Sequence, residues 1–214
     1  WKPVWRKSIA QNSYDIIIIG GGGHGLATAF YLAKQFKQKK IAVLEKGWIG
    51  GGNVGRNTTI IRSNYMLNKN QAFYEFSLKL WERIEKDINY NAMVSQRGII
   101  NLFHSDAQRD SYIRRGNTMR IHGADAILLN QEEVKKKYPF LNYDNARFPI
   151  KGGLWQPRGG TVRHDAVAWG YAHAADKYGV DIIENCEVVG FAIADGKCLG
   201  VKTNKGNIKA NKIG

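Results

Sequence analysis

A glycine-rich loop near the start of the chain has the spacing of a nucleotide-binding motif. Gly20, Gly22 and Gly25 fit the pattern G-x-G-x-x-G within a run of five glycines and one histidine. In such a loop the first glycine permits a tight turn, the second lets the backbone approach a pyrophosphate, and the third lets the helix pack closely on the strand. Amide groups at the helix start then face the phosphate charge. The pattern predicts a dinucleotide site, with His24 as a polar loop residue beside the phosphates.

An acidic residue follows at the distance that the motif requires. Glu45 ends the next apolar run, about 20 residues after the last glycine. Its carboxylate can accept hydrogen bonds from both hydroxyls of an adenosine ribose, and its charge repels a 2′-phosphate. The sequence therefore argues against NADP.

A second glycine cluster distinguishes FAD from NAD. Residues 50–59 read Gly-Gly-Gly-Asn-Val-Gly-Arg-Asn-Thr-Thr, where NAD enzymes usually continue into another helix. A turn of small and polar residues can wrap an extended dinucleotide along its pyrophosphate and ribityl chain. The alternative is an ordinary flexible loop, and FAD is favoured.

Hydrophobic periodicity gives the elements that must position these loops. A buried strand at 14–19, a helix at 26–36 and a strand at 41–45 form a βαβ unit, which predicts an α/β fold. Further helices are expected at 71–87, 106–121, 131–138 and 165–178, and strands at 180–184, 187–193, 199–203 and 207–213. In the helix at 71–87, four apolar residues share one face at spacings of three and four: Phe73, Phe76, Leu80 and Ile84.

Length and composition exclude several classes of protein. The 214 residues are 43% hydrophobic and carry 2 cysteines, which excludes disordered, collagen-like and disulfide-scaffold proteins. The longest aliphatic run, 16–19, is too short to span a membrane. Cys186 and Cys198 are expected to be small core residues in a reducing compartment, and the predicted location is cytoplasmic. The chain opens with Trp1 and no signal-like segment, which suggests a trimmed fragment.

The formal net charge of +14 admits three interpretations. A basic protein can bind nucleic acid, attract acidic cofactors or partners, or simply have a lysine-rich surface. The basic residues are dispersed, no tail of like charges occurs, and aromatic and basic residues do not alternate as in a nucleic-acid stacking platform. The dispersed surface is favoured, and neither a nucleic acid nor a membrane is expected as a partner.

Several longer passages resemble the β subunit of heterotetrameric sarcosine oxidase, in the glycine oxidase and D-amino-acid oxidase group of flavoproteins. The likeness covers essentially the whole chain. The passages that carry it are residues 20–29, 43–48, 55–65, 95–98, 156–160, 163–170 and 185–188.

The resemblance implies a Rossmann-like FAD-binding domain of the glutathione-reductase type with a partial α+β substrate domain. The family's β subunit is nearly twice as long, so the chain is expected to be an N-terminal fragment with an incomplete FAD site, inactive alone. Its catalytic residues are unknown because the substrate-facing half is absent. The expected division is an arm at 1–13, a FAD-binding core at 14–65, a helical insertion and partial substrate domain at 66–160, and a return to the FAD-binding domain at 161–214.

The activity implied by the resemblance is oxidative demethylation of sarcosine to glycine, within a hetero-oligomer of sarcosine oxidase subunits. The one-carbon unit would pass to tetrahydrofolate, and electrons would pass through FAD and FMN to oxygen, giving hydrogen peroxide. NAD and tetrahydrofolate would bind a partner subunit. The resemblance implies noncovalent FAD contacts from Gly20, Gly22, Gly23, His24, Gly25, Glu45, Lys46, Asn53, Arg56, Asn57, Thr58 and Val188.

The family's covalent FMN maps onto His164, attached through the 8α-methyl carbon of the flavin. His164 stands at the expected start of the helix at 165–178, where the helix dipole disfavours an imidazolium and leaves a ring nitrogen free to attack an electrophilic carbon. Arg62, Arg97 and Arg158 are candidates for contacts to the FMN phosphate or to a partner. The other histidines, His104, His122 and His173, are expected to be surface or structural residues.

Two rival functions stay open. One is a single-flavin oxidase or dehydrogenase of another secondary or D-amino acid, in which His164 is only structural. The other is an inactive truncated fragment that binds adenine nucleotide weakly or not at all.

Overall fold

The computed structural model describes residues 2–214, which form two compact units. The first unit contains the residues up to Thr58 together with 86–92 and 163–214. The second contains 59–85 and 93–162. The first unit holds both predicted glycine loops and His164.

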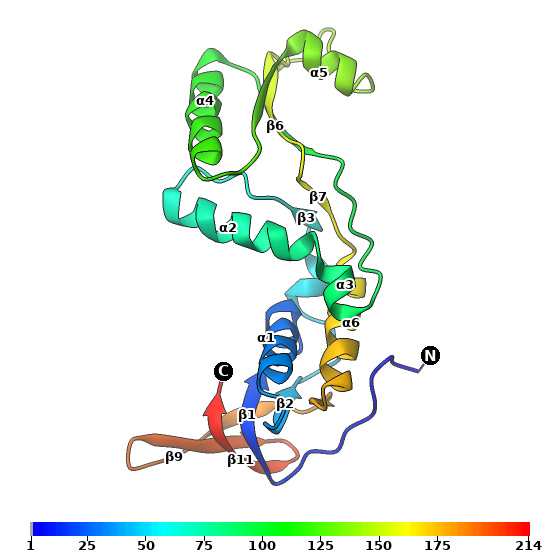
Figure 1. Ribbon diagram of the computed structural model, residues 1–214, viewed down its shortest axis with the longest axis vertical. Helices are drawn as coiled ribbons and strands as arrows, with labels where there is room; N and C mark the ends of the chain where they lie inside the picture. The colour runs from blue at the N-terminus through cyan, green and yellow to red at the C-terminus, as the bar shows by residue number, and fades with distance from the viewer. Residues whose placement is uncertain (1) are drawn as a thin grey trace. The chain divides into compact units, whose positions relative to one another are not determined.

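The first unit is built on a six-stranded sheet in the order β8-β2-β1-β11-β10-β9 (Figure 1). Strands β8, β2, β1 and β11 pair in parallel, and β11, β10 and β9 pair antiparallel as a meander. The predicted α/β class with a Rossmann-like βαβ core is therefore confirmed. The strands are β1 (Ser13–Ile19), β2 (Ile41–Leu44), β8 (Asp181–Ile183), β9 (Val188–Ala194), β10 (Lys197–Thr203) and β11 (Gly206–Ile213).

Two long helices of this unit, α1 (Gly23–Gln35) and α6 (His164–Lys177), lie against each other (Figure 1). The Phe30 side chain of α1 is fully buried, and its ring lies 5.8 Å from the Tyr171 ring and 5.8 Å from the Tyr178 ring, centroid to centroid. Five alanines of α6 are also buried, and their small side chains allow close packing of the helix. Both helices were predicted from periodicity, and both are confirmed.

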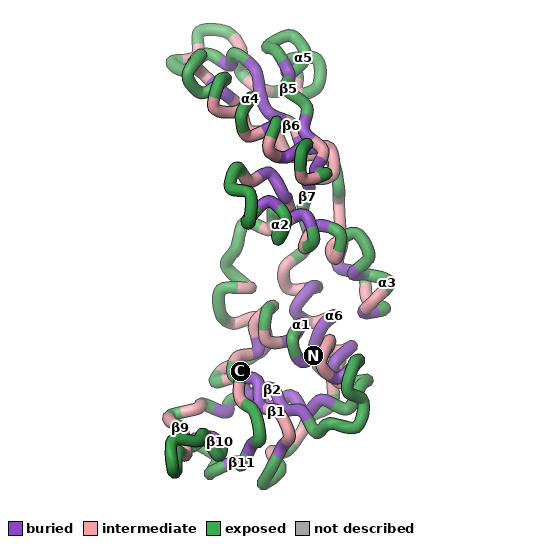
Figure 2. Tube along the Cα trace, turned by 60° about the vertical axis from the view of Figure 1, so that its left-hand side comes forward, coloured by how far each residue is buried: buried purple, intermediate pink, exposed green. Residues whose placement is uncertain are grey.

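In the sheet of the first unit, β2 and β8 are buried along their whole length, whereas no residue of β9 is buried (Figure 2). Ile17, Leu44 and Ile183 join residues of the meander in one apolar cluster, which also contains Cys186. The expectation that Cys186 is a small core residue is confirmed. For Cys198 the expectation is wrong, because this residue lies at the exposed hairpin between β9 and β10, where the two strands extend into solvent.

The second unit contains a three-stranded antiparallel sheet in the order β4-β6-β5. None of these three strands was predicted, and the central one begins with two glycines, Gly152 and Gly153, which are unfavourable in a strand. The structure uses them for close strand approach: a Cβ on Gly153 would stand 2.7 Å from the Ile100 side chain, and one on Gly152 would meet the carbonyl oxygen of Leu129. The elements are β4 (Ile99–Phe103), β5 (Ile127–Asn130), β6 (Gly152–Gln156), α4 (Asp106–Ile121) and α5 (Gln131–Lys137), with β3 (Ile60–Ile61) paired to β7 (Gly160–Thr161).

The helix predicted at 71–87 is two helices, α2 (Asn68–Trp81) and α3 (Ile84–Ile88). The apolar face assigned to it is wrong for α2: Phe73 and Phe76 are 67% and 63% exposed. The buried face of α2 instead carries Gln71, Glu75 and Leu78. Buried hydrogen-bond partners account for this inversion, because the backbone amide of Tyr65 donates to Gln71 and the hydroxyl of Ser63 donates to Glu75.

Among residues 2–214, no helix is both long enough and apolar enough to cross a membrane.

Candidate functional site

The first glycine loop has the geometry of a phosphate cradle. Gly20 adopts a φ of +106°, which L side chains rarely adopt, and a Cβ on Gly25 would clash with the carbonyl oxygen of Gly20. A Cβ on Gly22 would meet no atom within 4 Å. Two glycines are thus required by the turn itself, whereas the space above Gly22 is left open for a ligand.

The amino end of α1 completes this cradle. Gly22 is the N-cap residue, it provides no side-chain cap, and the first turn holds no acidic residue. The first amide groups of a helix have no partners within it, so they stay available to an anion. Gly23 is half-buried and His24 is exposed in this turn.

Glu45 follows β2 and faces the same loop. Its Oε2 accepts a hydrogen bond of 2.7 Å from the amide of Gly21, and its Oε1 accepts one of 2.8 Å from the amide of Gly47. The two amides fix the carboxylate beside the cradle, as required of a ribose acceptor. Lys46 lies next to it and is exposed.

A segment distant in sequence runs beside Glu45. The amide of Asn185 donates to the carbonyl of Gly47 and the amide of Cys186 donates to the carbonyl of Glu45, both at 2.8 Å. Val188 begins β9 two residues later and is half-buried against the apolar cluster. The structure therefore brings Val188 into the neighbourhood of Glu45, although 143 positions separate them in the sequence.

The second glycine loop has the same backbone arrangement as the first. Gly50 adopts a φ of +87°, and a Cβ on Gly55 would clash with the carbonyl oxygen of Gly50, as Gly25 does with Gly20. The two loops adjoin, since a Cβ on Gly23 would lie 3.4 Å from the Val54 side chain. In both loops the two glycines are five residues apart, Gly20 and Gly25 in the first and Gly50 and Gly55 in the second. This equal spacing is present in the sequence, but the sequence analysis did not use it. The loop and the short helix η1 (Asn53–Arg56) expose Asn53, Arg56, Asn57 and Thr58.

His164 is the first residue of α6, as predicted, and lines a cavity of about 460 Å³. Its Nδ1 atom is buried and has no hydrogen-bond partner. Besides His164, the cavity lining includes four aromatic residues, Trp5, Trp48, Tyr90 and Trp169. The cavity suits a flat aromatic ligand, and the unpartnered Nδ1 of His164 suits bond formation with an electrophilic carbon of that ligand.

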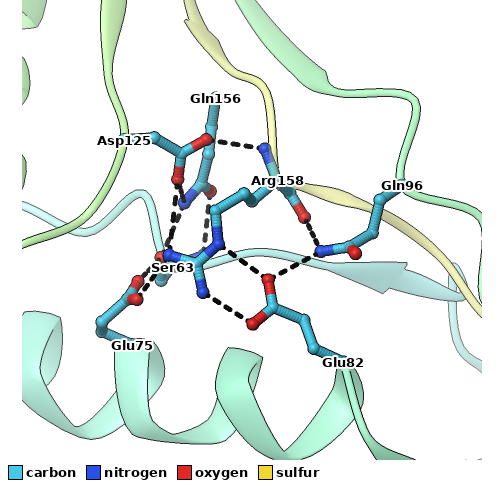
Figure 3. Close-up of polar contacts among 7 residues, drawn as sticks. All are labelled: Ser63, Glu75, Glu82, Gln96, Asp125, Gln156 and Arg158. Atoms are coloured by element: carbon cyan, nitrogen blue, oxygen red, sulfur yellow. Dashed lines mark hydrogen bonds and ion pairs between the residues drawn. The ribbon is translucent and has the colours of Figure 1, made fainter.

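The three candidate arginines, Arg62, Arg97 and Arg158, lie in the second unit. Arg158 is bound internally: its guanidinium donates to Glu75 at 2.7 Å and to Glu82 at 2.7 and 2.9 Å (Figure 3). The hydrogen bonds to Glu82 raise the pKa of Arg158, and the same hydrogen bonds lower the pKa of Glu82. Arg62 donates to the Asn64 side chain at 2.6 Å.

Buried polar groups extend this arginine cluster (Figure 3). The fully buried amide of Gln156 donates to Ser63 at 2.6 Å and to Asp125 at 3.2 Å, and Asp125 also accepts from the Arg158 amide at 2.6 Å. The cluster was not predicted, because its members come from separate loops, strands and helices. Its role in the second unit is to satisfy the polar face of α2.

Two of the remaining histidines make structural contacts. The ring of His173 donates from Nδ1 to the carbonyl of Val4 at 2.7 Å, and Nδ1 of His104 lies 3.1 Å from the carbonyl of Pro149. His122 is the C-cap residue of α4. No three His, Cys, Asp or Glu side chains within 2–214 are grouped so that they could hold a metal ion.

Comparisons with known proteins agree with this geometry. Over 213 residues the chain is 65% identical to the sarcosine oxidase subunit beta of Rhizobium meliloti strain 1021, covering all of this chain and 51% of that protein. It is 48% identical to the subunit of the same name from Arthrobacter sp., covering 98% of this chain and 52% of that protein. The chain therefore spans about half the length of these relatives.

Solved structures of similar fold include an enzyme at moderate sequence identity. The L-proline dehydrogenase of P. horikoshii superposes with a TM-score of 0.88 at 28% identity, covering 95% of this chain and 52% of that one. The family described as FAD dependent oxidoreductase matches residues 15–213. With its two glycine loops and the fixed acidic residue between them, the chain belongs to the FAD-dependent oxidoreductase family.

Proposed function

We propose that this chain is the FAD-binding part of a sarcosine oxidase β subunit, which oxidises the N-methyl group of sarcosine and yields glycine. The observation that carries the proposal is the 65% identity along the whole chain to a protein of that name. In the proposed complex, further subunits bind NAD and tetrahydrofolate, tetrahydrofolate takes up the one-carbon unit, and oxygen is reduced to hydrogen peroxide.

The chain's own residues hold the noncovalent FAD in this proposal. The amides of Gly22 and Gly23 face the pyrophosphate, Glu45 accepts hydrogen bonds from the adenosine ribose, and the backbone of Val188 meets the adenine. The second loop contributes the exposed polar residues, Asn53, Arg56, Asn57 and Thr58, with Lys46 and His24 nearby. The bound FAD supplies a two-electron acceptor for the C–N bond of the substrate.

His164 is the proposed attachment point of FMN. Its unpartnered, buried Nδ1 shows that the fold does not use that nitrogen for a protein contact, and the aromatic cavity beside it suits a flavin ring. A nitrogen held at the start of α6 also faces the positive end of the helix dipole, which favours the neutral imidazole as a nucleophile.

A second candidate function is a single-flavin dehydrogenase or oxidase acting on another secondary amino acid. The similarity to an L-proline dehydrogenase fold, at a TM-score of 0.88, favours it. In that case His164 carries no flavin and the aromatic cavity is structural.

Flavin content and substrate preference together test the proposal. The full-length protein is produced with its partner subunits, precipitated with acid, and assayed for flavin in the supernatant and in the pellet. We expect FAD in the supernatant, FMN in the pellet, no pellet flavin for His164→Ala, and peroxide formation with sarcosine. Equal pellet flavin in His164→Ala contradicts the assignment of His164, and faster oxidation of proline than of sarcosine supports the second candidate.

A further inference from the structure

The amino-terminal segment, residues 2–8, has no helix or strand, yet it is held in place at several points. The carbonyl of Val4 accepts the hydrogen bond from His173 on α6. The Arg6 side chain forms ion pairs with Asp176 at 2.6 Å and with Asp181 at 3.3 Å, and also donates to the carbonyl of Val180. This segment is the first part of the arm expected at 1–13, and from here on the name arm refers to residues 2–8 alone; its contacts fix it along α6 and β8.

The arm forms a wall of two cavities that share residues. The cavity beside His164 is lined by Pro3, Val4 and Trp5 of the arm. A second cavity of about 660 Å³ is also lined by Pro3 and Trp5, and both cavities contact Glu184. The two cavities are therefore neighbours along one surface of the first unit.

The second cavity differs from the first in its charge. Its lining contains Lys2, Arg6, Lys7 and Lys205, against one carboxylate from Glu184. Arg6 is neutralised by its two aspartates, so three ammonium groups face one acid.

These cations are available to a ligand. Within residues 2–214, neither Lys2 nor Lys7 has a carboxylate at ion-pair distance. Lys205 donates one hydrogen bond, to the carbonyl of Glu184 at 2.7 Å, and an ammonium group has three donors. Ser8, another residue of this lining, has a buried hydroxyl without a hydrogen-bond partner. A hydroxyl and ammonium groups can all donate hydrogen bonds to the same anion, so this lining suits an anionic ligand.

We propose that the second cavity binds the phosphate of the mononucleotide flavin whose ring occupies the cavity beside His164, with the arm closing over both ends. This inference rests on the proposed function, because it needs the flavin at His164. It also assigns the phosphate contact to Lys2, Lys7 and Lys205, in place of Arg158, whose guanidinium is occupied by Glu75 and Glu82.

The test uses the full-length protein in complex with its partner subunits, prepared from riboflavin-starved cells and then incubated with FMN or with riboflavin, which lacks the phosphate. The readout is acid-precipitable flavin as a function of flavin concentration. The variant is Lys2→Gln with Lys7→Gln, two exposed residues whose side chains form no ion pair within residues 2–214. The matched control is Lys202→Gln with Lys209→Gln, which removes the same charge from exposed positions on β10 and β11.

We expect the arm variant to need about tenfold more FMN for half-maximal attachment, while its attachment of riboflavin is unchanged and the control behaves as wild type. Adding Lys205→Gln should weaken FMN attachment further. An arm variant that matches wild type, or a control that loses as much as the arm variant, overturns the phosphate assignment. Each sample is also incubated with FAD, and the FAD that acid then releases reports whether each variant is folded.

Failure of the proposed function gives a different result. If wild type retains no acid-precipitable flavin, the assignment of His164 fails and the phosphate assignment fails with it. If wild type retains flavin and His164→Ala does not, the proposed function stands and the comparison of arm and control variants decides the inference alone.

Discussion

Gly22 and Gly25 lie in one loop, and the same substitution should affect them in opposite ways. A Cβ on Gly22 would meet no atom within 4 Å, whereas a Cβ on Gly25 would clash with the carbonyl oxygen of Gly20. Gly22→Ala should therefore disturb the ligand and leave the fold intact. Gly25→Ala should disturb the fold even when no ligand is present.

The magnitudes follow from the local geometry. Gly22 has a φ of −83° and a ψ of 178°, which alanine also adopts. The gain of about 0.4–1 kcal/mol from a less flexible unfolded chain offsets the loss of about 0.5–1 kcal/mol at an N-cap position. The stability of the apoprotein should then change by less than about 1 kcal/mol. Crowding the pyrophosphate with a methyl group should cost about 1–3 kcal/mol, or about five- to 150-fold in FAD affinity.

Two measurements on the full-length protein separate these effects. Urea unfolding of the apoprotein gives the free energy of unfolding, and titration with FAD, followed by flavin fluorescence, gives the dissociation constant. Gly25→Ala should lower the unfolding free energy by about 1–3 kcal/mol. The reasoning is refuted if Gly22→Ala binds FAD as tightly as wild type, or if Gly25→Ala leaves the apoprotein as stable as before.

Three further predictions concern stability, each measured by denaturant unfolding of the full-length protein. Arg158→Met should lower the free energy of unfolding by about 3–5 kcal/mol, because it leaves the buried carboxylate of Glu75 without its ion-pair partner. Adding Glu75→Gln should restore part of that stability. A double variant that is no more stable than Arg158→Met contradicts the pairing. The hydrogen bonds from Arg158 lower the pKa of Glu82 in the folded protein below its ordinary value. The ionised carboxylate therefore stabilises the fold at any pH above the ordinary pKa, and this stabilisation is lost as the pH falls through the lowered pKa. Glu82→Gln should thus be less stable than wild type at pH 7 and approach it in acid; a pH-independent difference argues otherwise. Phe30→Ala should lower the free energy of unfolding by about 3–5 kcal/mol, because the Phe30 side chain is fully buried. Phe36 is half-exposed, so Phe36→Ala should lower it by less than about 1 kcal/mol. Similar losses of stability in the two variants would contradict the burial of Phe30.

The parts of the fold that could be predicted are those with local signals. The strand at 14–19, the glycine turn and the helix after it lie within about twenty residues, so periodicity and glycine spacing define them together. The same holds for α6, whose start at His164 was predicted to within one residue. For the candidate site, the positions of Gly20, Gly25 and Glu45 followed from the same local pattern.

The parts that could not be predicted depend on partners far along the chain. On the buried face of α2, Glu75 accepts hydrogen bonds from Ser63 and Arg158, and Oε1 of Gln71 accepts one from the amide of Tyr65; Arg158 lies 83 residues from Glu75. A helix read by itself places Phe73 and Phe76 inside, since apolar residues usually face the core. An arm at 1–13 was expected, but the contacts that hold residues 2–8 along α6 and β8 could not be predicted for the same reason, because their partners lie about 170 residues away.

The two amides that hold Glu45 have a consequence for the evolution of cofactor preference. One carboxylate oxygen of Glu45 accepts a hydrogen bond from the amide of Gly21, and the other accepts one from the amide of Gly47. The side chain is therefore oriented before a nucleotide binds, and binding costs little further side-chain entropy. A cationic residue at this position, as a phosphorylated ribose would favour, removes the acceptor for both amides at once. A change of preference by that single substitution therefore leaves the amides of Gly21 and Gly47 without their acceptor, so it lowers the stability of the fold as well as changing the ligand.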